Sequence, residues 1–364
     1  MNEERRKQQI LHILAAGIRK VMEEAHLDYG KLQEIRLRTD QPLLILYQGE
    51  ELFLPAGRAK KHMVTKEEIK ETLEYSSHYS LYAYENEIRQ GFLTVEGGHR
   101  VGVAGKAILE QEKVKSLQHI SSVNIRMSHE IPGCADRLLP MITKNREVCH
   151  TLIISPPCGG KTTLIRDLIR QISDGNAHVK GCTVGVVDER SEIGGCYLGV
   201  AQNHLGSRTD ILDCCPKAEG MIMLIRSMSP RVLAVDEIGA QEEIRAVEYA
   251  MQCGCKLIAS VHGNSMAEIA SKPGLGELVR QRRFERYVVL ENREHPGEIK
   301  EIFDERGSRF MQKLIGCILI LLSTTAGGVF IWRGTAAVSG KTDVHPPYSG
   351  TDPGRNRIQR RTSF

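Results

Sequence analysis

The sequence predicts an α/β protein in which a parallel sheet carries a phosphate-binding loop, preceded by a smaller α+β module. Three observations predict this class. An apolar run, Thr151–Ile154, stops at a loop of small and kinked residues that leads into a helical pattern. A second apolar run, Val232–Val235, ends in Asp-Glu. After Pro132-Gly133 short β-rich runs alternate with helical runs, which is typical of a parallel sheet with crossover helices.

The composition sets limits on the class of protein. At 364 residues the chain is long enough for two domains, which we place at 1–132 and 133–305. Its 49 Lys and Arg and 45 Asp and Glu give a formal net charge of +4, so charge alone makes no case for a nucleic-acid partner. The ten cysteines form no C-x-x-C pair, and the N-terminus does not resemble a signal peptide. We therefore expect reduced thiols in a cytosolic protein.

The N-terminal module mixes helical and strand patterns. Apolar residues at helical spacing predict one amphipathic helix over 5–25, and further helices over 66–75 and 80–90. Alternating patterns predict two strands around a turn at 39–42, a hairpin over 91–108 with Gly97-Gly98 at its tip, and a strand over 116–127. The arginines that recur on these strands are either solvated or make anion and subunit contacts: Arg36, Arg38, Arg100 and Arg126.

The second region supplies the elements of the parallel sheet. A short helix is predicted over 136–143 and a longer one over 162–173, with strands at 151–154, 184–188, 232–236 and 257–261. Each of these strands ends in polar or acidic residues. In open α/β sheets ligands lie beyond the carboxyl ends of the strands, so we expect these endings to cluster around one ligand.

The loop after the first of these strands matches a triphosphate-binding loop with one departure. Ser155 stands where the first glycine of G-x-x-x-x-G-K-[ST] belongs, so the backbone there should differ from a strict P-loop. Lys161 would reach the β and γ phosphates, and the hydroxyl of Thr162 would bind Mg²⁺. The predicted nucleotide-binding residues are Ser155, Pro156, Pro157, Cys158, Gly159, Gly160, Lys161, Thr162 and Thr163.

Acidic residues and a histidine follow the other strands. Asp236 would hold Mg²⁺ and Glu237 would polarise the attacking water, which are the two carboxylates that phosphoryl transfer needs. Glu189 and Glu192 either help to position the water or the metal or belong to a surface loop. His262 either senses the γ-phosphate or is an ordinary polar loop residue.

Phosphoryl transfer gains from an arginine donated across a subunit boundary. Candidate arginines in trans are Arg208, Arg226 and the run Arg280, Arg282 and Arg283, and the sequence does not choose among them.

Several segments resemble the stage III sporulation protein AA family of endospore-forming bacteria. They include EIRLRTDQPLLI, GGHRVGVAGKA, ISPPCGGKTTLIRDLIR and VVDERSEIGG, within a resemblance that runs from about residue 32 to about residue 304. More distantly the chain is similar to the type II and type IV secretion ATPases. This resemblance implies a RecA-like (ASCE) P-loop ATPase core behind an N-terminal α+β module, with subunits forming a hexameric ring.

The resemblance also implies an activity. It suggests a cytoplasmic hydrolase of ATP, with Mg²⁺, at the inner face of a membrane, energising a channel complex between mother cell and forespore. By this resemblance Lys161 and Thr162 belong to the P-loop and Asp236-Glu237 to the Walker B pair. Glu189 and Glu192 resemble the acidic box of secretion ATPases and His262 their histidine box, while the Arg-Asp that often follows Walker B is absent.

Two other function classes stay open. One is a nucleotide-dependent assembly scaffold or switch that binds ATP with little turnover. The other is a nucleic-acid motor, which we favour less because the sequence has no basic strip bearing aromatic residues, so no nucleic-acid partner is expected.

The C-terminal region departs from this picture. Residues 314–332 carry no charge, lie between Lys313 and Arg333, and are long enough to span a bilayer, so 313–332 is a candidate transmembrane helix. Residues 333–364 are polar and predicted to be disordered. From Met311 onward the sequence also resembles the start of stage III sporulation protein AB. The segment is therefore either a membrane anchor or a neighbouring reading frame joined to this one.

Overall fold

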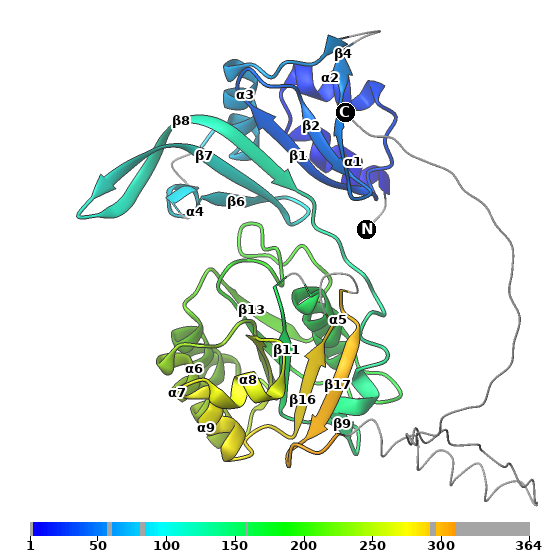
Figure 1. The fold of residues 1–364 in the computed structure, drawn as a ribbon, viewed down its shortest axis with the longest axis vertical. Coiled ribbons are helices and arrows are strands. Elements are labelled where there is room, and N and C mark those ends of the chain that lie inside the picture. The colour runs from blue at the N-terminus through cyan, green and yellow to red at the C-terminus, as the bar shows by residue number, and fades with distance from the viewer. Residues whose placement is uncertain are drawn as a thin grey trace, which may run out of the picture. The chain divides into compact units, whose positions relative to one another are not determined.

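Two β-sheets organise the chain, an antiparallel sheet formed by the N-terminal residues and a mostly parallel sheet formed by those that follow (Figure 1). The computed structural model describes residues 3–56, 60–80, 84–89, 91–157, 159–291 and 296–309. Within these residues no helix is both long and apolar enough to cross a membrane. The candidate span at 313–332 and the polar tail lie outside the described residues, and the domain limits at 1–132 and 133–305 stay predictions.

The N-terminal sheet has six strands in the order β3-β2-β1-β8-β7-β6. Its strands alternate as the sequence predicts, since Ile35 and Leu37 of β1 are fully buried whereas Arg36 and Arg38 point to the other face. The buried face packs against the first helices in one hydrophobic core. Strands β4 and β5 pair with each other outside this sheet. The elements of the N-terminal region are α1 (Glu3–His12), α2 (Ala16–Glu24), β1 (Leu32–Arg38), β2 (Leu44–Tyr47), β3 (Glu50–Phe53), β4 (Pro55–Ala56), β5 (Lys60–Lys61), α3 (Lys66–Ser76), α4 (Glu85–Arg89), β6 (Phe92–Val95), β7 (His99–Glu110) and β8 (Lys113–Arg126).

One helix prediction in this region was wrong in extent. The single helix predicted over 5–25 is broken, because Ala15 adopts an extended conformation and donates its backbone N–H to the hydroxyl of Thr72 at 3.1 Å. That bond replaces an intrahelical one and lets both α1 and α2 reach the core. Of the helix predicted over 80–90, the part at 85–89 is confirmed by α4, and residues 81–83 and 90 lie outside the described residues. The predicted hairpin with Gly97-Gly98 at its tip is confirmed by the pairing of β6 with β7.

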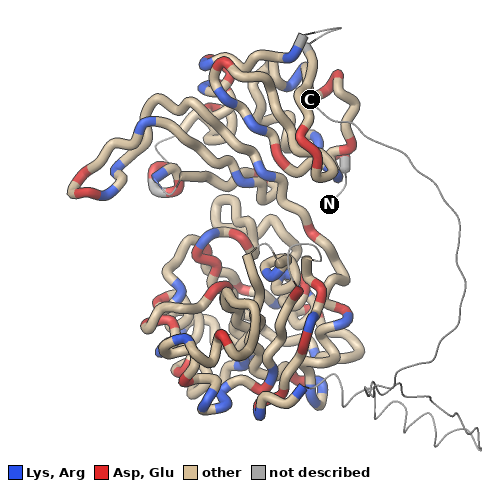
Figure 2. The backbone as a smooth tube through the Cα atoms, in the orientation of Figure 1, with Lys and Arg blue, Asp and Glu red and all other residues tan. Residues whose placement is uncertain are grey.

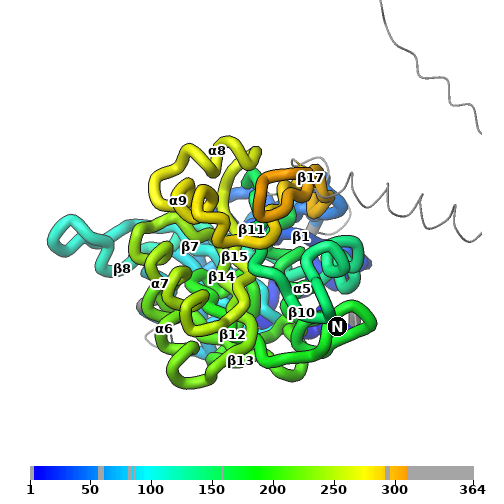
Figure 3. The backbone as a smooth tube through the Cα atoms, turned by 90° about the horizontal axis from the view of Figure 1, so that it is seen from below, coloured from blue at the N-terminus to red at the C-terminus, as the bar shows by residue number. Residues whose placement is uncertain are grey.

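The second sheet has seven strands in the order β13-β12-β14-β15-β11-β16-β17. Its strands are parallel apart from the edge strand β17, which runs antiparallel to β16. Helix α5 covers one face, and α6, α7 and α9 cover the other (Figure 3). Strands β9 and β10 pair with each other in a separate two-stranded sheet. The elements of this region are β9 (Thr143–Lys144), β10 (Glu147–Val148), β11 (Thr151–Ser155), α5 (Lys161–Asp174), β12 (Val184–Asp188), β13 (Thr209–Asp213), α6 (Lys217–Met228), β14 (Val232–Val235), α7 (Gln241–Gln252), β15 (Lys256–His262), α8 (Met266–Ser271), α9 (Leu275–Arg280), β16 (Arg286–Leu290) and β17 (Ile299–Asp304).

The predicted parallel sheet and its four strands are confirmed, but the sheet is larger than predicted, since β13, β16 and β17 were missed. The helix predicted over 136–143 was also wrong. Only Leu139–Ile142 form a short 3₁₀ helix, and Pro140, in its first turn, has no N–H to extend an α-helical ladder toward the N-terminus. Acidic and basic residues intermingle along the described chain, in keeping with the near-balanced charge (Figure 2).

Asp167 fastens the helix that follows the candidate phosphate loop. Its buried carboxylate on α5 accepts backbone N–H bonds from Gly133 at 3.0 Å and Ala135 at 2.9 Å, and side-chain bonds from Arg170 and Gln171. Burial alone would raise the pKa of this carboxyl, but the hydrogen bonds outweigh burial and lower the pKa below its ordinary value. The ionised side chain thus ties α5 to the segment that enters the parallel sheet.

We expect Asp167→Asn to lower the free energy of unfolding by about 2 kcal/mol at pH 7, since it weakens hydrogen bonds to a buried charge. A lowered pKa means that the ionised group stabilises the fold above the pKa of an unfolded Asp, about 4, and that this contribution is lost as pH falls through the lowered value. Urea unfolding of both proteins between pH 7 and pH 3 should therefore show a difference that shrinks below about pH 4. A difference that does not change with pH would contradict this account.

Candidate functional site

The candidate phosphate loop follows β11, which lies between β15 and β16 in the parallel sheet. The strand runs one residue further than predicted, because Ser155 pairs with His262 and its carbonyl accepts the N–H of Gly263 at 3.1 Å. The hydroxyl of Ser155 bonds the carbonyl of Pro156 at 2.9 Å. The residue in place of the first P-loop glycine is thus the end of a strand. Cys158 lies outside the described residues.

Two glycines in this loop have no room for a side chain. Gly160 precedes α5 with φ of +78°, and a Cβ there would lie 2.6 Å from the backbone nitrogen of Gly297. A Cβ on Gly159 would lie 2.5 Å from the hydroxyl oxygen of Ser155. The Gly297 N–H also donates to the carbonyl of Gly159 at 2.8 Å. A close-fitting backbone cradle therefore stands at the N-terminus of a 14-residue helix, where N–H groups and the helix dipole favour an anion.

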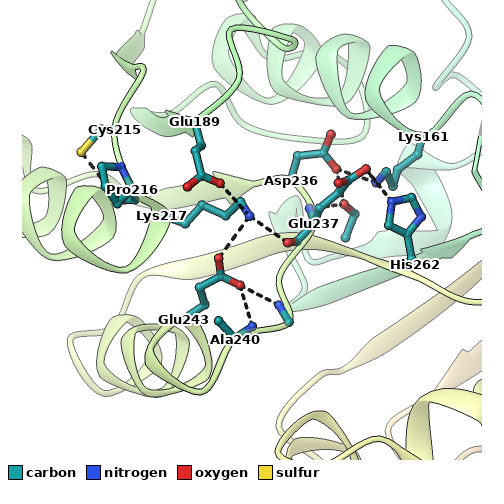
Figure 4. Close-up of polar contacts among 12 residues, drawn as sticks. Lys161, Glu189, Cys215, Pro216, Lys217, Asp236, Glu237, Ala240, Glu243 and His262 are labelled. Atoms are coloured by element: carbon teal, nitrogen blue, oxygen red, sulfur yellow. Dashed lines mark hydrogen bonds and ion pairs between the residues drawn. The ribbon is translucent and has the colours of Figure 1, made fainter. Parts of the chain in front are cut away.

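The side chains of five predicted residues meet beside this loop, and Figure 4 labels four of them, Lys161, Asp236, Glu237 and His262. Lys161 is only 5 % exposed, and its Nζ lies 2.6 Å from Glu237 Oε1 and 3.2 Å from Asp236 Oδ1. The hydroxyl of Thr162 donates to Asp236 Oδ2 at 2.8 Å, and Nε2 of His262 lies 2.8 Å from Glu237 Oε1. These residues come from the start of α5, which follows the loop after β11, and from the carboxyl ends of β14 and β15. The structure thus places these side chains close together, as the residues at the ends of the predicted strands led us to expect.

Glu237 sits in this cluster with an unusual backbone. Its φ of +54° is the left-handed region, which costs a non-glycine residue about 1 kcal/mol or more. Burial would raise the pKa of its carboxyl, but Lys161, by hydrogen bond and charge, and then His262 and Arg190 lower it below the ordinary value. Glu237 is therefore ionised at neutral pH.

The two glutamates of the other acidic segment point to different partners. Glu189 lies 3.0 Å from Nζ of Lys217, whereas Glu192 accepts a bond from Arg100 of β7 at 2.9 Å. Neither is paired with Lys161. Asp188, at the end of β12, accepts the backbone N–H groups of Glu192, Ile193 and Gly194 and so shapes the turn that carries both glutamates. Burial raises the pKa of Asp188 to about 6.

The candidate arginines lie away from this cluster. Arg208 precedes β13, at the amino end of the sheet, and its guanidinium donates to the carbonyl of Ser173 at 2.8 Å. Arg226 is exposed in the last turn of α6. Arg280 pairs with Glu277, and Arg283 bonds Gln281. Within one subunit, none of these contacts reaches the cluster.

Two further residues of the site were missed by sequence reasoning. The hydroxyl of Ser260 donates to Asp236 and accepts the backbone N–H of Glu237 at 2.9 Å. Lys217 bonds the backbone carbonyl of Glu237 at 3.0 Å. A serine inside an otherwise apolar run was a usable signal for Ser260, which is fully buried, whereas no local pattern signals Lys217.

The arrangement suits a magnesium-bound phosphate group. A hydroxyl and a carboxylate 2.8 Å apart are the pair that holds Mg²⁺ in P-loop sites, with water and phosphate oxygens completing the shell. The buried ammonium of Lys161 supplies a cation beside the cradle. A small hollow next to the cluster is lined by Val187, Asp188, Glu189, Arg190, Glu192, Lys217, Asp236 and Glu237.

Comparison with protein families identifies the chain. The family described as "Sporulation stage III, protein AA" matches residues 4–310. The chain belongs to this family. The stage III sporulation protein AA of Bacillus subtilis (strain 168) is 40% identical over 303 residues, which cover 82% of this chain and 96% of that protein. The match to the family does not include the candidate span at 313–332.

Comparison with solved structures shows which fold this chain has. It is similar to the ATPase DotB of Legionella pneumophila, with a TM-score of 0.51, 15% identity and 75% of each chain covered. The Yersinia pseudotuberculosis DotB gives a TM-score of 0.53 at 12% identity, covering 76% of this chain and 75% of that one. The predicted fold class is confirmed: an N-terminal antiparallel sheet followed by a parallel α/β core like that of the ATPase DotB.

Gly160 and Gly254 allow a matched test of the cradle. Both have positive φ, but a Cβ at Gly254 would meet nothing within 4 Å, whereas at Gly160 it would meet the Gly297 backbone. We expect Gly254→Ala to cost about 1 kcal/mol through backbone strain alone. Gly160→Ala should cost at least about twice as much, because contact adds to strain. Thermal unfolding of the two variants measures this, and equal shifts in melting temperature would show that the cradle is not closely packed.

Proposed function

We propose that this protein is a magnesium-dependent ATP hydrolase that acts in sporulation. One observation carries the proposal: Lys161, Thr162, Asp236, Glu237 and His262 converge within hydrogen-bonding distance at the carboxyl edge of the sheet. Membership of the sporulation stage III protein AA family supports the biological setting, and a fold like that of the ATPase DotB supports the reaction class.

In the proposed reaction each residue has a separate task. Lys161, now held by Glu237 and Asp236, exchanges these carboxylates for the β and γ phosphate oxygens of ATP. Thr162 and Asp236 would hold Mg²⁺, which would neutralise negative charge on the phosphate oxygens. Glu237, released from Lys161, orients the attacking water and accepts its proton, and His262 faces the same carboxylate oxygen.

The acidic segment serves the same site in this proposal. Glu189 lies on the wall of the hollow beside Asp236 and Glu237, and Glu192 lines it from the same turn. In this proposal both would help to position the attacking water or the metal. The loop from Ser155 to Thr163, including Cys158, would enclose the phosphates.

We further propose that the protein works as a hexameric ring at the cytoplasmic face of a membrane, where it energises membrane components of a channel between mother cell and forespore. The support is the family and the secretion-ATPase fold. No nucleic-acid partner is part of this proposal. ATP binding with little turnover, as in an assembly scaffold or switch, is the alternative that a turnover measurement separates.

Two substitutions test the assignment of the site. Lys161→Ala should abolish both ATP binding and hydrolysis, because it removes the cation of the cradle. Glu237→Gln should reduce the turnover number by at least about 100-fold while ATP still binds, since it removes the base and leaves the cradle intact. Steady-state phosphate release and ATP binding are measured with Mg²⁺. Undiminished hydrolysis in either variant refutes the assignment, and binding without turnover in the unmodified protein favours the switch.

A shared site in a ring predicts that the rate per subunit rises with protein concentration as the ring assembles. Arg226, exposed on α6, is the better candidate for donation to a neighbour, whereas Arg208 is held by backbone carbonyls of its own chain. We expect Arg226→Ala to lower the rate of the assembled protein by about 100-fold or more without changing oligomer size. Activity and size-exclusion chromatography across concentrations check this, and an unchanged rate assigns the role elsewhere.

A further inference from the structure

Lys217 occupies a place where a lysine is unfavourable. It is the first residue of α6, directly after Pro216, and acidic rather than basic residues are stabilising in the first turn of a helix. Its side chain is only 15 % exposed. Burying a long cationic side chain at the positive end of a helix needs compensation from other groups.

The compensation comes from three oxygen atoms on three different segments. Nζ of Lys217 lies 3.0 Å from Glu189 Oε2, 3.1 Å from Glu243 Oε1 and 3.0 Å from the backbone carbonyl oxygen of Glu237 (Figure 4). Burial opposes the charge, but the hydrogen bonds to Glu189 and Glu243 outweigh it and raise the pKa of Lys217 above its ordinary value. Lys217 is therefore a cation that joins the end of β12, the end of β14 and the starts of α6 and α7.

These contacts fix both sides of the strained residue. The N–H of Glu237 is held by the hydroxyl of Ser260 at 2.9 Å, and its carbonyl is held by Lys217. The next turn is held as well, because Glu243 accepts the N–H groups of Gly239 at 2.7 Å and Ala240 at 3.0 Å while it is paired with Lys217. A left-handed backbone at Glu237 persists because its surroundings fix it in this way.

We propose that Lys217 is a positioning residue of the hydrolytic site, which holds Glu237 in the left-handed conformation that directs its carboxylate at Lys161 and His262. This inference rests on the proposed ATP hydrolysis. Lys217 bonds Glu237 through the backbone carbonyl rather than the carboxylate, so it acts through the conformation of that residue. The bonds of its ammonium lie on Glu189, Glu237 and Glu243 and not on the phosphate loop, so ATP should still bind without it.

The test is a set of substitutions in the full chain. Lys217→Met keeps the aliphatic stem and removes the charge and the donors, and it should lower kcat by about 100-fold, the low end of what a positioned acid or base contributes. The KM for ATP should stay within about threefold, because the substitution does not change the interactions that bind the substrate and the transition state equally. Lys217→Arg, which keeps a charged donor, should retain at least about tenfold more activity than Lys217→Met.

Lys256 provides the matched control. It is a partly buried lysine paired with Glu285 at 2.8 Å, at the amino end of β15 and so at the edge of the sheet away from the phosphate loop. Lys256→Met should leave kcat and KM within about twofold of the unmodified protein. Its ion pair with Glu285 is partly exposed to solvent, and such pairs contribute little to stability. Circular dichroism and thermal unfolding establish that each variant is folded. If Lys217→Met is not folded, Lys217→Gln replaces it with the same expectation.

The outcomes separate the two proposals. Absence of ATP hydrolysis in the unmodified protein overturns the proposed function. Hydrolysis there, with kcat of the folded Lys217 variants unchanged, overturns the role of Lys217 alone. A loss of ATP binding in parallel with kcat would also overturn it, because Lys217 would then support the fold of the whole site and not the placement of Glu237.

Discussion

The structure of the site depends on the burial of one cation, the ammonium of Lys161. A charge that is 5 % exposed is stable only with close counter-charges, because an unpaired buried charge costs several kcal/mol. Those counter-charges are Asp236 and Glu237. They follow β14, and in the order β14-β15-β11 one strand separates β14 from the strand that carries the candidate phosphate loop. The intervening strand β15 supplies Ser260 and His262, which bond the same two acids. The strand order therefore places beside Lys161 the carboxylates that its buried charge requires.

The same constraint explains which parts of the site could be predicted from the sequence. The residues that directly follow buried strands were found, since carboxyl ends of parallel strands meet at one edge. Lys217 could not be placed, because its three oxygen partners come from segments near residues 189, 237 and 243 and converge only in the fold. The partner of Glu192 is Arg100, a residue 92 positions away on β7. Sequence spacing carries no information about such pairs.

The fold shows a similar division. Fully apolar runs such as 151–154 and 184–187 predicted central strands, because both faces of these strands are covered by helices. The edge strand β13 reads Thr-Asp-Ile-Leu-Asp and is only partly buried, so its sequence resembles a loop. The break between α1 and α2 depends on Thr72, 57 residues from Ala15, and no local pattern near residue 15 signals it. Local periodicity thus predicts strands and helices that are buried evenly along their length. It fails where a contact with a residue far away in the sequence determines where an element ends.

In the proposed reaction, the lowered pKa of Glu237 links phosphate binding to the strength of the base. Lys161 is the main group that depresses this pKa, by its hydrogen bond and by its charge. When phosphate oxygens take over Lys161, that depression weakens and the carboxylate of Glu237 becomes a better proton acceptor. Its geometry does not relax at the same time, since Ser260 and Lys217 hold the backbone on both sides independently of Lys161. In the proposed reaction one residue can therefore neutralise the empty site and act as the base in the filled one, because its charge environment changes while its backbone does not.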